Sequence, residues 1–191
     1  MSNKKAILLT FDVEDWFQVE NFKPYIEFET WNSFDLRVEK STRRILDLLD
    51  GFAFPCRATF FILGWIARKL PGLVTEIRDR GHEVASHGFN HHLCQQLNYK
   101  DLENDLRDSR HLLEDITGAD VIGFRAPSFA VSDDTLKVVQ SAGYAYDSSY
   151  NSFSAHGRYG TLDLSEARKT AGSYCFKNGF IELPVSNLPL F

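Results

Sequence analysis

The sequence predicts an α/β fold in which strands and helices alternate along the chain. Short runs rich in apolar, β-branched and aromatic residues read as strands, and longer segments with helical spacing of apolar residues lie between them. The apolar character of the runs suggests strands that are buried on both faces, which is typical of a parallel sheet. Repeated βα units with these features predict a barrel of parallel strands.

The expected strands are short and are separated by segments of very different length. They cover residues 6–11, 58–63, 83–86, 121–124, 144–146 and 180–183. Residues 151–172 are polar and show little periodicity, so we expect a long loop there.

Four segments have the pattern of helices. The first two, residues 38–49 and 73–80, are followed by Gly51 and Gly81, and glycine can take the left-handed conformation that ends a helix.

The longest expected helix covers residues 99–117, with Asn98 as its N-cap and Gly118 beyond its end. A last helix begins after Ser132 and ends before Gly143. The buried stripe of the longest helix is expected to be Leu102, Leu106, Leu112 and Leu113.

Length and composition favour a single domain over residues 1–191. With 43% hydrophobic residues the chain can bury a sizeable core. The net charge of -5 and the lack of a Lys/Arg block argue against a nucleic-acid partner. The first apolar run is too short for a signal peptide or a membrane span, so we expect no transmembrane segment and a cytoplasmic location. The cysteines Cys56, Cys94 and Cys175 are odd in number and far apart, which predicts free thiols.

Side chains that can bind metal or move protons follow four of the expected strands. An acidic cluster at residues 12–15 follows the first strand, His87 and His91 the third, Arg125 the fourth and Asp147 the fifth. In a barrel of parallel strands these ends open onto one face, where active sites assemble. On spacing alone, Arg125 is interpreted as a structural salt-bridging residue.

The two histidines and the acidic cluster predict a divalent-metal site. Two imidazoles and one carboxylate leave positions open at the metal, which suits the activation of water better than a closed structural site does. The alternative is a pair of surface histidines and a solvated acidic turn, but a carboxylate at the end of an apolar strand usually needs a partner. The chain is therefore predicted to be a hydrolase.

Five motifs then carry a resemblance to a known family. The sequence resembles the polysaccharide deacetylases of carbohydrate esterase family 4, which share the NodB-homology domain. Residues 12–17 resemble the branch found at bacterial exopolysaccharide loci, whose relatives include allantoinase-like and peptidoglycan-deacetylase-like enzymes. The resemblance implies a distorted (β/α)7 barrel. The motifs lie at residues 10–15, 58–64, 86–91, 125–128 and 146–149.

The resemblance implies a hydrolase that removes N-acetyl, or alternatively O-acetyl, groups from a polysaccharide or amino-sugar substrate. Asp12 matches the family's catalytic base, and Arg125 matches the arginine that orients this base, which overrides the structural interpretation. Asp147 resembles the acidic residue of the fourth motif, which in the family helps to position a catalytic histidine.

The resemblance also implies the metal ligands. His87 and His91 match the two metal-binding histidines, and either Glu14 or Asp15 must be the third ligand because Val13 follows the base. Branches with an Asp-x-Asp spacing favour Glu14. The implied cofactor is zinc, with cobalt and nickel as alternatives.

Aromatic and motif residues predict where an N-acetylated carbohydrate would bind. Trp16, Phe17 and Phe129 follow strand ends and could form a sugar-binding wall, because sugar rings pack against exposed aromatic faces. Pro127 and Ser128, in the motif that contains Arg125, are expected to contact substrate.

The chain departs from the family pattern near its C-terminus, where the family supplies a further catalytic histidine. We therefore expect a C-terminally short domain that lacks the elements closing the barrel, with an edge that a second copy of the chain would cover. His156 or water would then supply the proton to the leaving amine. Two alternatives stay open: an allantoinase-like C–N hydrolase acting on a small cyclic amide, and a metal-holding, sugar-binding remnant without turnover.

Overall fold

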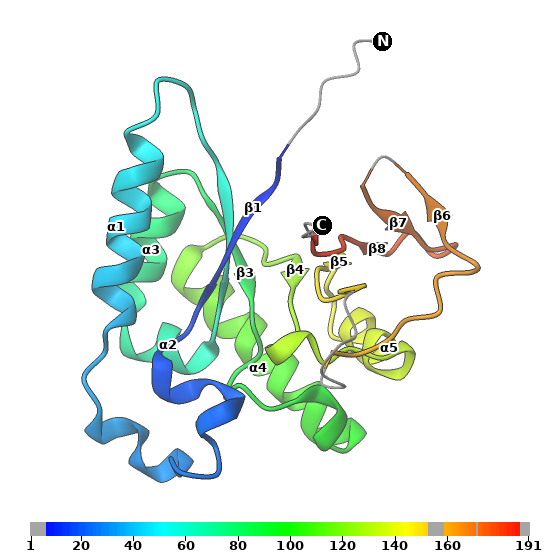
Figure 1. Ribbon diagram of the computed structural model, residues 1–191, viewed down its shortest axis with the longest axis horizontal. Coiled ribbons are helices and arrows are strands. Elements are labelled where there is room, and N and C mark those ends of the chain that lie inside the picture. Colours follow the sequence, from blue (N-terminus) through cyan, green and yellow to red (C-terminus); the bar gives the residue numbers. More distant parts are fainter. Residues whose placement is uncertain (1–6, 153–158, 171, 188–191) are drawn as a thin grey trace.

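The computed structural model describes residues 7–152, 159–170 and 172–187, and its strands form one sheet (Figure 1). The strands follow the order β1-β2-β3-β4-β5-β8-β7-β6. They are β1 (Leu9–Val13), β2 (Ala58–Ile62), β3 (Glu83–Ser86), β4 (Gly123–Phe124), β5 (Tyr146–Asp147), β6 (Arg168–Lys169), β7 (Tyr174–Cys175) and β8 (Ile181–Glu182).

The sheet is parallel where it carries the candidate site. Strands β1 to β5 and β8 pair in parallel, whereas β6 and β7 add an antiparallel hairpin beside β8. The α/β fold with a largely parallel sheet is therefore confirmed. Among the described residues, β1 and β6 lie at the two ends of the row of strands.

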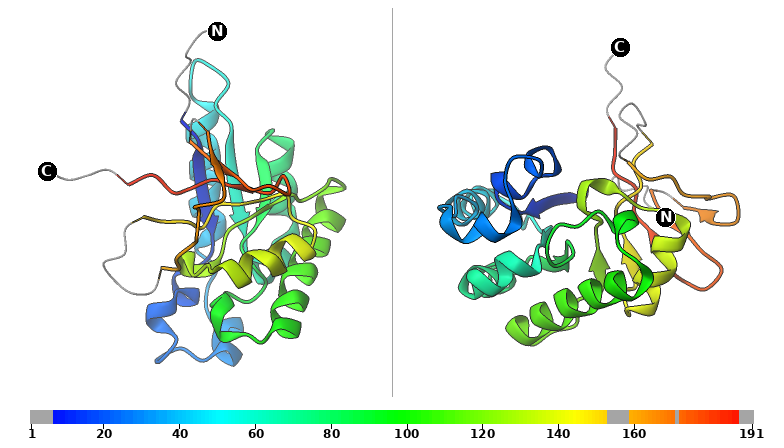
Figure 2. Two further views of the ribbon diagram at one scale, coloured as in Figure 1. Left: turned by 90° about the vertical axis from the view of Figure 1, so that its right-hand side faces the viewer. Right: turned by 90° about the horizontal axis from the view of Figure 1, so that it is seen from below.

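Helices cover one face of the sheet, as the two views of Figure 2 show. Helix α4 packs on β3, on α2 and α3 to one side and on α5 to the other. The α-helices are α1 (Val38–Asp50), α2 (Gly64–Lys69), α3 (Pro71–Asp79), α4 (Tyr99–Thr117) and α5 (Asp133–Ser141).

The main core lies between the sheet and these helices. Successive side chains of a strand point to opposite faces, so in β2 Phe60 and Ile62 join the core that contains Leu106 of α4 and Val74 of α3. Phe61 points the other way and packs with Ala85 and Tyr146 in a second, smaller cluster. The prediction that β2 is buried on both faces is thus confirmed.

Several predicted boundaries need correction. Strand β1 begins at Leu9, where pairing with Ala58 starts, and Ile7 and Leu8 are exposed; Ala6 lies outside the described residues. Strand β5 includes Asp147, which was expected to follow the strand.

The helix-ending glycines differ from one another. Gly118 takes the left-handed conformation at the end of α4, with a φ of 65°, as expected. Gly51 does not, because the end of α1 keeps right-handed geometry. The helix expected at residues 73–80 begins two residues earlier, at Pro71, whose fixed φ suits the first turn of a helix.

Helix α2, strands β6 and β7 and the short 3-10 helices were not predicted from the sequence. Helix α2 has only six residues, and β6 lies inside the segment expected to be a loop. Strands β6 and β7 have two residues each, too few to show a period. All three cysteines are free, as expected. Among the described helices, none is long and apolar enough to cross a membrane.

Candidate metal and catalytic site

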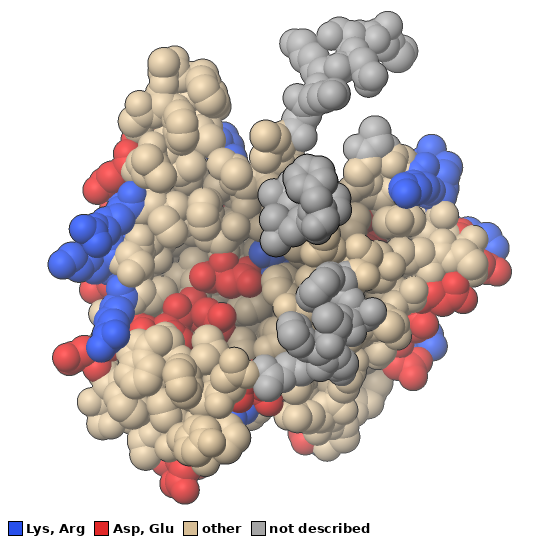
Figure 3. Space-filling view, in the orientation of Figure 1, with Lys and Arg blue, Asp and Glu red and all other residues tan. Residues whose placement is uncertain are grey.

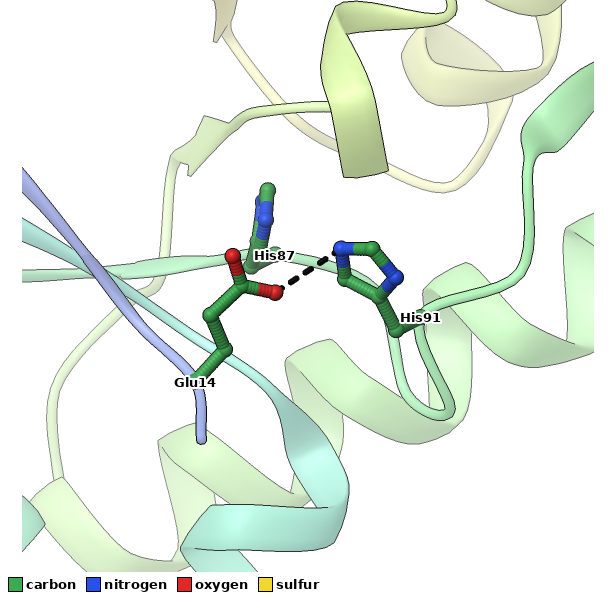
Figure 4. A group of neighbouring side chains, drawn as sticks. All are labelled: Glu14, His87 and His91. Atoms are coloured by element: carbon green, nitrogen blue, oxygen red, sulfur yellow. Dashed lines mark ion pairs between the residues drawn. The ribbon is translucent and has the colours of Figure 1, made fainter. Parts of the chain in front are cut away.

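Three side chains from two strand ends converge on one buried point (Figure 4). Glu14 follows β1, whereas His87 and His91 lie in the loop that follows β3. One ligand atom from each residue lies within 4.8 Å of the others. His91 Nε2 is 2.8 Å from Glu14 Oε2. The geometry therefore brings both predicted histidines and one predicted carboxylate together.

The environment of His87 leaves one ring nitrogen available. Its Nδ1 lies 2.8 Å from the carbonyl oxygen of Arg125, so Nδ1–H donates and Nε2 is the nitrogen that can bind a metal. Burial lowers the pKa of His87, although the charges of Asp12 and Glu14 act to raise it. The ring is thus held in the neutral form that a metal ligand requires.

Glu14 has the complementary charge. Burial acts to raise its pKa, but the hydrogen bond with His91 and the charge of His87 outweigh burial and lower it. Glu14 Oε2 is buried, and apart from its contact with His91 Nε2 it has no hydrogen-bond partner among the described residues. An ionised, incompletely satisfied oxygen beside two imidazoles is a donor set that suits a divalent cation such as zinc.

The loop that carries the histidines is fixed by neighbours that sequence reasoning missed. Asp105 on α4 accepts a hydrogen bond from Phe89 N at 2.8 Å, and Ser109 Oγ donates to Gly88 O at 3.0 Å. Gly64 N, at the start of α2, donates to the same carbonyl oxygen. Asp105 and Ser109 lie one helical turn apart and share one face of α4. Two polar residues at this spacing were the feature of the sequence that could have indicated their contact with the loop.

A second pair of side chains lies beside the metal-ligand candidates. Arg125 Nη1 donates to Asp12 Oδ1 at 2.8 Å. The Arg125 guanidinium is buried above the Phe61 ring, 4.1 Å from its centroid. The rest of the guanidinium donates to Ser148, from Nε to the carbonyl oxygen at 2.8 Å and from Nη2 to Oγ at 2.9 Å. These contacts hold the carboxylate of Asp12 in one orientation.

Asp15 lies apart from this cluster and supports the chain locally. Its Oδ1 accepts from Trp16 N at 2.9 Å at the start of the 3-10 helix Trp16–Gln18, in a capping box completed by Gln18. Its Oδ2 accepts from the backbone N–H groups of Arg37 at 2.7 Å and Val38 at 3.0 Å, at the start of α1. Of the two carboxylates proposed as third ligand, the structure places Glu14 beside the histidines.

Asp147 also lies outside the pocket. Its side chain is fully buried on β5 and accepts hydrogen bonds from the hydroxyl and the backbone N–H of Ser149. The next residue, Ser148 just after β5, accepts hydrogen bonds from Arg125 and so links Asp147 to the arginine through the chain. His156, considered as a proton donor, lies outside the described residues.

A pocket opens over the site. It is lined by Asp12, Glu14, Val19, Glu20, Asn21, His87, His91, Ser128 and Phe129. Figure 3 shows Asp and Glu side chains gathered in a hollow in the middle of this face. Glu20 and Asn21 were not predicted as site residues, and they come from the short 3-10 helix Glu20–Phe22.

The predicted substrate-binding residues are distributed differently. Ser128 lines the pocket, whereas Pro127 is buried behind it and Trp16 does not line it. Trp16 packs edge-on against Phe22 and Phe34 and is 37% exposed. Ser128 and Phe129 both have positive φ, of 53° and 55°, which is strained for side-chain-bearing residues and is typical of functional sites.

Comparison with known proteins adds an independent finding. The sequence model of the polysaccharide deacetylase family matches residues 1–146. The chain is 31% identical over 135 residues to the peptidoglycan deacetylase-like protein FGM2 of Gibberella zeae, a match covering 69% of this chain and 40% of that protein. It is 32% identical over 103 residues to a peptidoglycan-N-acetylglucosamine deacetylase of Bacillus cereus, covering 54% of this chain and 47% of that protein.

The fold comparison agrees with these matches. A crystal structure of a Mycobacterium smegmatis protein assigned to the polysaccharide deacetylases superposes with a TM-score of 0.65 and 25% identity, over 94% of this chain and 58% of that chain. The two sequence matches cover 40% and 47% of the relatives, so the chain spans about half the length of the curated relatives it matches. The motifs, the fold and the family match agree, and the chain belongs to the polysaccharide deacetylase family, carbohydrate esterase family 4.

Proposed function

We propose that this chain is a divalent-metal-dependent deacetylase that hydrolyses the amide bond of N-acetyl groups on a carbohydrate. The observation that carries the proposal is the convergence of Glu14, His87 and His91 beside the Asp12–Arg125 pair in one pocket. This combination places a metal-ligand set and a candidate proton acceptor around the same space.

Glu14, His87 and His91 would hold the metal, for which we propose zinc. One carboxylate and two imidazoles suit zinc, and the open pocket beside them leaves room for water and substrate. When bound, the metal would polarise the acetyl carbonyl and lower the pKa of water.

Asp12 would accept the proton of the attacking water. Arg125 Nη1 holds Oδ1 of Asp12, so the carboxylate keeps a fixed position at the pocket wall. Because the guanidinium is itself fixed by Ser148 and stacked on Phe61, Arg125 supplies an orienting contact that needs no rearrangement during the reaction.

The choice of an N-acetylated carbohydrate rests on the relatives. The Bacillus cereus protein is named for the deacetylation of peptidoglycan N-acetylglucosamine, so an acetamido sugar is the first substrate class to test. The two curated relatives are named as a deacetylase and a deacetylase-like protein, and neither name points to an allantoinase-like reaction.

Acetate release from N-acetylglucosamine oligomers tests the proposal, with three variants measured for metal content in parallel. His87→Ala should lose both metal and acetate release, whereas Asp12→Asn should keep the metal and lose about a hundredfold or more in kcat. His111→Ala, an exposed histidine on α4, is the matched control and should behave like the wild type. Acetate release that survives in Asp12→Asn or His87→Ala would contradict the proposal.

A further inference from the structure

Two buried carboxyl groups lie on adjacent strands, outside the pocket. Asp147 on β5 and Glu182 on β8 are register partners in adjacent parallel strands. Both residues are 0% exposed, and neither lines the pocket. Two neighbouring buried carboxyl groups cannot both be ionised without a large energetic penalty, so one proton must stay with the pair.

Hydrogen-bond directions indicate which residue keeps the proton. Asp147 Oδ2 accepts from Ser149 N at 3.0 Å and Oδ1 faces Ser149 Oγ at 2.7 Å. Ser149 Oγ also accepts from Ala126 N, so its own hydrogen is free to point at Asp147. Both oxygens of Asp147 are therefore acceptors, as in an ionised carboxylate.

Glu182 has the opposite arrangement. Its Oε1 accepts from Tyr150 N at 2.9 Å, whereas its Oε2 is buried and has no well-formed hydrogen bond among the described residues. Oε2 is thus the atom with room for a proton. Burial and the neighbouring Asp147 both raise the pKa of Glu182 well above its ordinary value, which agrees with this assignment.

The pair is linked to Arg125 through Ser148. Ser148 directly follows Asp147 and accepts two hydrogen bonds from Arg125. Its hydroxyl donates to the carbonyl oxygen of Leu183, the residue after Glu182, at 2.9 Å. Leu183 N in turn donates to Asp147 O at 2.8 Å. The strand ends that carry the acid pair therefore also fix the acceptors of Arg125.

We propose that Glu182 is a protonated acid that donates a hydrogen bond to Asp147, and that this pair positions Ser148 and Arg125, and through them Asp12. Glu182 is then a positioning residue that touches neither the substrate nor the metal ligands. The role in turnover rests on the proposed deacetylase function, whereas the protonation state of the pair can be tested without it.

The groups around the pair are few and can be named. Burial raises the pKa of Asp147, and the hydrogen bonds from Ser149 and the charge of Arg125 act in the opposite direction without outweighing burial. Burial raises the pKa of the Cys94 thiol, which lies in the 3-10 helix Cys94–Gln96, and the charge of Asp147 raises it further. On the β7 side, Tyr174 is the register partner of Glu182. The backbone N–H groups of Ser149 and Tyr150 complete the surroundings of Glu182.

The sign of the pH dependence follows from the raised pKa. The folded chain binds the Glu182 proton more tightly than the unfolded chain does, so the stabilisation is complete below the ordinary glutamate pKa. It is lost as the pH rises through the higher folded value. Glutamine at this position cannot titrate, and its amide can still donate to Asp147.

Thermal unfolding between about pH 5 and about pH 9 tests the protonation state. The Tm of the wild type should fall with rising pH relative to that of Glu182→Gln. Glu166→Gln, an exposed pair partner of Lys177, is the matched control and should follow the wild type. Asp147→Asn should be less stable than Glu182→Gln, since its amide group would face the two Ser149 donors. A pH profile of Glu182→Gln parallel to the wild type, an unfolded Glu182→Gln, or a better tolerated Asp147→Asn would each overturn the assignment.

Turnover tests the positioning role. Glu182→Ala should lower kcat for acetate release by about tenfold or more, with KM and metal content nearly unchanged, and Glu182→Gln should restore kcat. Wild-type kcat in Glu182→Ala would overturn the positioning role while leaving the deacetylase function in place. No acetate from the wild type would instead contradict the proposed function, and the unfolding experiment would still decide the protonation of the pair.

Discussion

Glu14 and Asp15 are neighbours in the sequence but have separate tasks in the structure. Glu14 lies beside His91 in the candidate metal site, whereas Asp15 is 3% exposed and accepts backbone hydrogen bonds at the start of α1. Both carboxylates were predicted as candidate metal ligands because each follows the same apolar strand. Asp12 and Glu14 line the pocket, whereas Val13 and Asp15 are buried, so the side-chain alternation of β1 continues for two residues beyond its end.

This separation predicts opposite outcomes for the two substitutions. Glu14→Gln should lower zinc affinity strongly and leave the Tm of the metal-free chain nearly unchanged. Asp15→Ala should keep zinc binding and lower the free energy of unfolding by about 1–2 kcal/mol, because the cap and the backbone donors lose their acceptor. Zinc titration and thermal unfolding of both variants check this. Loss of zinc binding in a folded Asp15→Ala would contradict the assignment.

The aromatic and proline assignments show where residue-level reasoning reaches its limit. Trp16 was expected to face a ligand because it follows a strand end, and Pro127 because it lies in the motif that contains Arg125. Trp16 instead packs against Phe22 and Phe34, and Pro127 is buried. The pocket instead uses Glu20 and Asn21. Trp16, Glu20 and Asn21 lie in short 3-10 helices after β1, and Pro127 lies in another after β4. Helices of about three residues are too short for a hydrophobic period to indicate the direction of their side chains.

At the scale of elements, the sequence was informative where a segment was long or had a clear end signal. Helix α4 matches its predicted range because Asn98 accepts from Asp101 N at its start and Gly118 ends it. Strands β2 and β3 were recognised from their apolar runs. Helix α2 and the β6–β7 hairpin were missed because their few residues form through tertiary pairing rather than local preference.

The end of α4 gives a stability prediction with its own control. Gly118 has a φ of 65°, so Gly118→Ala should lower the free energy of unfolding by about 1 kcal/mol. Gly72 lies within α3 with nothing within 4 Å of an added Cβ, so Gly72→Ala should be neutral or raise stability by about 0.5–1 kcal/mol. Chemical denaturation measures both. Equal effects of the two substitutions would contradict the role given to the left-handed cap.

At the scale of the whole molecule, the parallel order of strands explains how residues far apart in the sequence meet. Strands β1, β3 and β4 end on the same side of the sheet, which brings Asp12 to Arg125 across 113 positions of sequence. The sequence could predict this meeting from the repeated βα pattern. It could not predict the order of β6, β7 and β8 or the Asp147–Glu182 pair, because these depend on which short strand pairs with which.

The central claim is that one pocket holds a zinc ion that the chain needs for deacetylation. The most direct measurement is acetate release from N-acetylglucosamine oligomers by one sample before chelation, after chelation and after zinc is restored, with bound zinc counted at each step. We expect about one zinc per chain and acetate release that disappears and returns with the zinc. Acetate release that continues in the zinc-free chain, or none in the chain with zinc bound, would contradict the account.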